Sequence, residues 1–114
     1  MSKRKTARKA GSAWTDGEIK TLVLAYNLML KLELEGTKYN KSEIRRWLIG
    51  GYLKNRSNSS IEMKLCNVSK FRQLSGLPMI AGYKPYGNAQ KRLGEIISEQ
   101  EGKPVFELNR IGRG

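Results

Sequence analysis

Six side chains at helical spacing are the residues of this sequence best suited to hydrogen bonding and contact chemistry. They fall between residues 59 and 75, opposite an apolar stripe of Ile61, Leu65, Val68 and Phe71. Their amide, carboxylate, hydroxyl, ammonium and sulfur groups are of the kinds that contact base edges in the major groove of DNA. The candidates for base readout are Ser59, Glu62, Met63, Cys66, Asn67 and Lys70.

Asn67 is the strongest of these candidates, because an amide can bond adenine through two hydrogen bonds. Glu62 can accept from a cytosine amine, and Met63 can contact a thymine methyl group. The alternative interpretation of Asn67 is an ordinary polar residue on a helix surface. Glu62 also stands three residues after Ser59, the spacing of a capping box that would start a helix at this point. The pattern therefore predicts a helix over 59–75 that either reads bases or is a surface helix of a small α-domain.

Basic residues elsewhere in the chain are candidates for contacts with phosphate. The net charge is +12, and residues 38–94 hold twelve lysines or arginines against two glutamates. Such a field favours a polyanion, although an acidic membrane or an acidic protein would also be attracted. The phosphate candidates are Arg45, Arg46, Lys54, Arg56, Lys64 and Lys84.

The first twelve residues are basic and have no hydrophobic period. We expect residues 1–12 to be a disordered arm that lies along the DNA backbone or enters a minor groove. A solubilising tail is the alternative interpretation. The residues that would make these contacts are Lys3, Arg4, Lys5, Arg8 and Lys9.

The composition argues against catalysis. The chain has no histidine, one cysteine and ten carboxylates that form no evident cluster. Nucleophiles paired with histidine and the usual zinc sites therefore cannot be built. We expect no catalytic residue, metal, cofactor or small-molecule substrate. No apolar run is long enough for a membrane span, and no signal peptide is recognisable. The expected location is the cytoplasm, in association with the nucleoid.

Three further helices are expected around the candidate reading helix. The first spans 14–35 and starts with a capping box of Thr15 and Glu18. One of its apolar stripes is Ile19, Leu22, Val23, Tyr26 and Leu30, and the other is Leu24, Leu28 and Leu32. A helix that is apolar on two sides has to be covered on both.

The second helix begins at Asn40, which with Glu43 forms an N-cap pair, and its inner face is Ile44, Trp47 and Leu48. Trp14 and Trp47 are both expected in the core. A loop over 77–88 follows the reading helix, where Tyr83, Lys84 and Tyr86 could contact DNA. Packing of the tyrosines against the helices is the alternative, and it is favoured more for Tyr83 than for Lys84. Asn88 should cap a last helix over 89–100, and its stripe (Ala89, Leu93, Ile96 and Ile97) should cover Leu24, Leu28 and Leu32.

These elements resemble a Myb/SANT-type helix-turn-helix over residues 14–68. Myb-like repeats open with W-T-x-x-E, carry a second tryptophan on helix two and enter helix three through R-S or R-T. The matching residues are Trp14, Thr15, Glu18, Trp47, Arg56 and Ser57. The third aromatic of the Myb pattern is replaced by Leu65, and the segment between the two tryptophans is longer.

A second resemblance spans residues 39–90. The segments KYNKSEIRR, RSNSSIEMKLCNVS and LPMIAGYKPYGNAQ are similar to the N-terminal domain of bacterial HNH-type, modification-dependent restriction endonucleases. The resemblance implies a role in engaging DNA. It does not extend to nuclease activity, because this sequence contains no nuclease domain and no histidine.

Taken together, the sequence predicts an all-α fold with a three-helix, Myb/SANT-like helix-turn-helix core and a C-terminal helix. Residues 13–100 would form a single DNA-binding domain, followed by a tail over 101–114. The expected function is non-catalytic binding of double-stranded DNA, with helix 59–75 in the major groove. The alternative is a small protein-interaction module or phage-type inhibitor that binds an acidic surface or the DNA channel of a nuclease complex.

Overall fold

The computed structural model describes residues 13–87 and 90–101, which form four helices and, within those ranges, no strand. The helices are α2 (Asp16–Leu34), α3 (Lys41–Ile49), α4 (Asn58–Leu74) and α5 (Lys91–Gln100). The all-α prediction is therefore confirmed. The predicted arm over 1–12, the Asn88 cap, Ala89 and the tail beyond Glu101 lie outside the described residues.

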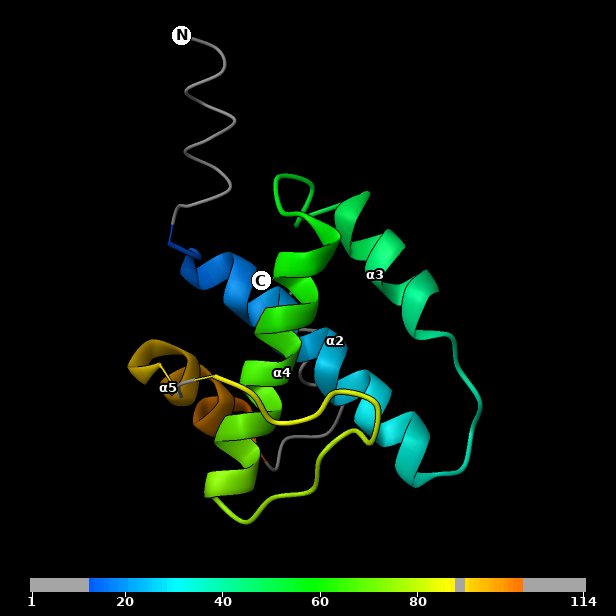
Figure 1. Ribbon diagram of the computed structural model, residues 1–114, viewed down its shortest axis with the longest axis vertical. Helices are drawn as coiled ribbons and strands as arrows, with labels where there is room; N and C mark the ends of the chain where they lie inside the picture. The colour runs from blue at the N-terminus through cyan, green and yellow to red at the C-terminus, as the bar shows by residue number, and fades with distance from the viewer. Residues whose placement is uncertain (1–12, 88–89, 102–114) are drawn as a thin grey trace, which may run out of the picture.

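Helices α2 and α4 each contact all three other helices, and α4 carries the candidate site. Helices α3 and α5 lie on opposite sides of α4 in Figure 1. Gly36 and Gly76 follow α2 and α4 with φ of +76° and +72°, conformations that glycine adopts without steric cost. Both helices are thus followed by a glycine in the left-handed region.

The predicted start of α2 is confirmed in detail. The Glu18 amide donates to Thr15 Oγ1 over 3.1 Å, and the Thr15 amide donates to Glu18 Oε1 over 2.9 Å. This reciprocal capping box satisfies two backbone donors that would otherwise lack partners at the helix start. Trp14 precedes it and packs against the core, as expected.

Helix α2 buries one broad face. The prediction that α5 would cover a second stripe of α2 is wrong: Leu28 is 41% exposed, and Leu24 and Leu32 are only partly buried. Both α4 and α5 pack on α2, and its buried face is widened by Ala25 and Met29. On a 3.6-residue helix Leu28 projects to the opposite side from that face. The stripe of α5 is otherwise as predicted, with Leu93, Ile96 and Ile97 buried.

Helix α3 begins at its predicted cap, where the Glu43 amide donates to Asn40 Oδ1 over 2.9 Å. Its inner face is narrower than expected. Leu48 is fully buried and Ile44 is partly buried, but Trp47 is 71% exposed. Ile44 and Leu48 are four residues apart and share the inner side of this nine-residue helix, whereas Trp47 shares the outer side with Glu43. The placement of Trp47 in the core was therefore wrong.

A loop over 75–87 crosses α4 on its way to α5 and is drawn in yellow-green and yellow in Figure 1. The Ile80 amide donates to the Tyr26 hydroxyl over 3.0 Å, and the Ala81 amide donates to Glu33 Oε2 over 2.8 Å. The Tyr26 hydroxyl also lies 2.7 Å from Ser69 Oγ on α4. The buried Tyr26 hydroxyl thus joins the loop to α2 and α2 to α4, and Glu33 adds an exposed hydrogen bond to the loop. Helix α5 starts two residues later than predicted, with Gln90 at its N-cap.

Candidate nucleic-acid interface

The candidate reading helix starts earlier than its sequence suggested. Ser57 is the N-cap of α4, and its hydroxyl accepts from the Ser60 amide over 3.1 Å. Ser59 lies inside the first turn, so the capping box of Ser59 with Glu62 was wrong. Glu62 is released from that role, and its carboxylate lies 3.5 Å from the Arg45 guanidinium.

A groove runs between the first turns of α4 and the loop that crosses it. Its volume is about 680 Å³, and it is open to solvent rather than enclosed. Four of the six predicted readout residues line it from α4, and five loop residues line the other side. The lining residues are Ser59, Glu62, Met63, Cys66, Gly82, Tyr83, Lys84, Pro85 and Tyr86.

The loop wall of this groove is fixed by hydrogen bonds. The Tyr86 amide donates to the Cys66 carbonyl over 3.3 Å. The Asn67 side-chain amide donates to the Tyr86 carbonyl over 2.6 Å. Tyr83 is buried, and its hydroxyl accepts from Arg45 Nη1 over 2.6 Å. Of the two interpretations of Tyr83, packing against the helices is the one observed, and the groove has two firmly held walls.

Asn67 serves this wall and is not available to a ligand. Only 8% of its surface is exposed, and a Cβ atom placed on Gly87 would come within 2.6 Å of its Nδ2 atom. The expected exposure of Asn67 was therefore wrong, because the loop covers this part of α4. Lys70, one turn further along, is half-buried and does not line the groove.

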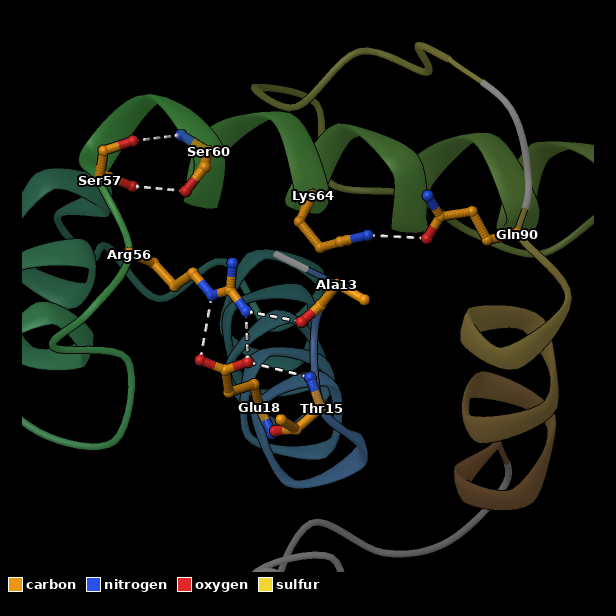
Figure 2. A network of polar contacts seen from close by, with 8 residues as sticks. All are labelled: Ala13, Thr15, Glu18, Arg56, Ser57, Ser60, Lys64 and Gln90. Carbon is orange, nitrogen blue, oxygen red and sulfur yellow. Dashed lines mark hydrogen bonds and ion pairs between the residues drawn. The ribbon is translucent and has the colours of Figure 1, made fainter. Parts of the chain in front are cut away.

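Two of the predicted phosphate contacts point into the protein, as Figure 2 shows. Arg56 Nε and Nη2 donate to Glu18 Oε2 and Oε1 over 3.0 and 2.7 Å, and Nη2 also donates to the Ala13 carbonyl over 2.9 Å. The guanidinium lies 4.8 Å from the centroid of the Trp14 ring. Hydrogen bonding from Arg56 holds the pKa of Glu18 below its usual range. Arg56 thus fixes the starts of α2 and α4 to each other.

Lys64 lies beside this cluster and is 6% exposed. Its ammonium group donates to Gln90 Oε1 over 2.7 Å and lies 5.3 Å from the Trp14 ring centroid. Burial and then the nearby Arg56 charge lower the pKa of Lys64. The expectation that Arg56 and Lys64 contact phosphate was wrong, since both side chains serve the packing of α2, α4 and α5.

Arg45 is also engaged. Besides Tyr83 and Glu62, it donates to Asn58 Oδ1 over 2.9 Å and to Ser42 Oγ over 3.3 Å. Its side chain joins α3, the start of α4 and the loop. The sequence did not indicate that Asn58 accepts a hydrogen bond from Arg45 or that Pro85 lines the groove. Both contacts depend on segments that meet only in the folded chain.

The remaining phosphate candidates face solvent. Arg46, Lys54 and Lys84 are exposed and make no ion pair with another described residue. They lie on α3, on the turn before α4 and on the loop wall of the groove. Residues 38–87 hold ten lysines or arginines against Glu43 and Glu62, so the field in this region is positive.

Cys66 is the only cysteine of the chain; it lines the groove and is partly buried. Burial, followed by the charge of Glu62, raises the pKa of its thiol. The thiol is therefore protonated at neutral pH and acts as a small apolar group.

Two further properties of the described residues concern other kinds of site. Residues 13–87 and 90–101 contain no group of three or more histidine, cysteine or acidic side chains arranged to hold a metal ion. Within the same ranges, every helix falls short of the length and apolarity needed to cross a bilayer.

Comparisons with known protein families, with curated proteins and with solved structures find no match to this chain.

Proposed function

We propose that this protein binds double-stranded DNA without catalysis, through the first half of α4 and the adjoining loop. In this proposal α3, the turn over 50–57 and α4 act as a Myb/SANT-like helix-turn-helix, within a single DNA-binding domain over 13–100. Ser59, Glu62, Met63 and Cys66 contact base edges, and Arg46, Lys54 and Lys84 contact phosphates.

The observation that carries the proposal is the groove beside α4. Ser59, Glu62 and Met63 are at least partly exposed on consecutive turns at the N-terminal end of the helix, where a recognition helix contacts bases. Lys84 lies on the opposite wall, within the same groove. A helix N-terminus also favours anionic groups through its unpaired amides and its dipole.

The distribution of charge supports the same surface. The cations without ion-pair partners among the described residues include Arg46 on α3, Lys54 on the turn before α4 and Lys84 on the loop. Such cations supply the sequence-independent part of DNA affinity. The resemblance to the N-terminal domain of HNH-type restriction endonucleases agrees with a DNA-engaging role, and that relationship remains part of the proposal.

A protein-interaction role is the second candidate, and one observation favours it. Trp47 and Tyr52 are 71% and 63% exposed, and large aromatic side chains often anchor protein interfaces. Because Arg46 and Lys54 are nearby in sequence, the partner would present an acidic surface.

Fluorescence anisotropy with short random-sequence duplexes, unmodified and methylated, tests the main proposal. We expect binding whose log affinity falls linearly with log salt concentration, because phosphate contacts release counterions. Absence of binding to every duplex at low salt would overturn the proposal and leave the acidic protein partner as the function to test.

Alkylation of Cys66 by iodoacetamide locates the contact surface. Since Cys66 is the only cysteine, its rate of modification reports on the groove alone. We expect saturating duplex to slow the reaction markedly. If DNA binds and the rate does not change, the bound surface lies elsewhere on the protein.

A further inference from the structure

We propose that the groove between α4 and the loop receives the C5 methyl group of thymine. This inference rests on the proposed function and deepens it. In this inference the side chains of the two walls together give the protein a preference for thymine-containing sites.

The first step is the chemistry of the walls. Met63 contributes from α4 and is 46% exposed, and Tyr86 contributes from the loop and is 60% exposed. Cys66 and Pro85 lie in the same groove and are partly buried. Four apolar side chains from two segments therefore leave apolar surface open to solvent at one place, which is the place from which α4 would read DNA.

The second step is the chemistry of the ligand. Among the base edges exposed in the major groove, the thymine methyl is the apolar group, and the others present hydrogen-bond donors and acceptors. An apolar groove on a reading surface therefore discriminates in favour of thymine. The Glu62 carboxylate lines the same groove, where it can accept from the adenine amine of the same base pair.

The third step is the rigidity of the site. The hydrogen bonds from Asn67 to the Tyr86 carbonyl and from Tyr86 to the Cys66 carbonyl fix the loop wall against the helix. A wall that is ordered before binding saves the entropy cost of ordering it with the ligand. The groove is also open to solvent and not enclosed. This suits a base that stays in the stack, because an extruded base needs an enclosing pocket.

A pair of duplexes that differ only in this methyl group tests the inference. One is the alternating deoxyadenosine–thymidine duplex, and the other has deoxyuridine in place of every thymidine. Because thymine recurs at every second position, no specific site has to be known. Burial of one methyl group predicts about fourfold tighter binding to the thymidine duplex, with the same salt dependence for both.

Two substitutions assign the preference to the groove. Met63→Ala and Tyr86→Ala should each reduce the ratio of the two affinities toward one, while circular dichroism confirms that the helices are intact. Leu74→Ala is the matched control, because Leu74 is 66% exposed on the same helix but outside the groove. It should leave the ratio unchanged.

The possible outcomes separate this inference from the proposed function. Equal and salt-dependent binding to both duplexes overturns the methyl site and leaves DNA binding standing. A preference for thymidine that survives both Met63→Ala and Tyr86→Ala overturns the assignment to this groove. If the protein binds neither of these two duplexes and no random-sequence duplex, DNA binding itself is overturned.

Discussion

Two regions of this protein treat their charges in opposite ways. On α2 and α5 several charged side chains pair with each other, as in Arg92 with Asp16 at 2.7 Å and Arg92 with Glu95 at 3.0 Å. On α3, the turn before α4 and the loop, Arg46, Lys54 and Lys84 have no such partners among the described residues. Among the described residues, the excess of positive over negative side chains therefore lies in residues 38–87.

A second contrast lies within the basic segment itself. Arg56 and Lys64 are buried and support the junction of α2, α4 and α5, whereas Arg46 and Lys84 face solvent. The lysines and arginines of this segment thus divide into buried residues that stabilise the fold and exposed residues that a partner can contact. The following predictions test that division.

Loss of Arg56 should have the largest effect on stability. Arg56→Ala leaves the Glu18 carboxylate, whose side chain is 12% exposed, without its partner. Breaking a buried ion pair in this way costs about 3–5 kcal/mol of unfolding free energy. Urea unfolding followed by circular dichroism measures it. Arg46→Ala is the matched control and should change stability by less than about 0.5 kcal/mol. Equal effects of the two substitutions would contradict the division.

Removal of three solvent-facing cations should have the largest effect on DNA binding. In the triple variant Arg46→Ala, Lys54→Ala and Lys84→Ala, the negative slope of log affinity against log salt should become shallower by about three. The control variant carries Lys20→Ala, Lys31→Ala and Lys91→Ala, which removes the same charge from α2 and α5. Its slope should match that of the wild type. Similar losses in both variants would mean that net charge, and not its location, governs binding.

The stability of the Arg56 region should depend on pH in the acid range. Hydrogen bonds from Arg56 lower the folded-state pKa of Glu18 below its ordinary value of 4.5. The unfolded chain therefore binds the proton more readily, so this contribution is present above pH 4.5 and is lost as pH falls through the folded-state pKa.

Urea midpoints measured from neutral pH down into the acid range test this expectation. Glu18→Gln should be less stable than wild type at neutral pH, and the difference should shrink as the pH falls. Glu43→Gln, at an exposed position of α3, should follow the wild-type curve. A constant difference between Glu18→Gln and wild type at all pH values would argue against an ionic contribution from Glu18.

The smallest effect is expected at Trp47. Because this side chain is 71% exposed, Trp47→Ala should change the free energy of unfolding by less than about 0.5 kcal/mol. Its neighbour Leu48 is 1% exposed, and Leu48→Ala should cost about 2–5 kcal/mol. Urea unfolding of both variants compares them directly. A large loss at Trp47 would restore the interpretation of this residue as part of the core.

The sequence by itself determined the local features of this protein. The Thr15–Glu18 capping box, the Asn40 cap and the burial of Leu93, Ile96 and Ile97 on α5 are present as predicted. Each depends on residues within about one or two helical turns, where side-chain and backbone chemistry act directly. The sequence also shows directly that positive charge is concentrated in the middle of the chain.

Only the tertiary structure decided which polar side chains are available. Asn67, Arg56 and Lys64 looked like surface residues, yet they bond to Tyr86, Glu18 and Gln90, from 19 to 38 positions away in the sequence. Hydrophobic periodicity specifies that a helix has a buried face, but it does not specify which loop or helix end will cover its polar face. That choice depends on how the segments meet, because a buried polar group is stable only where a partner satisfies it.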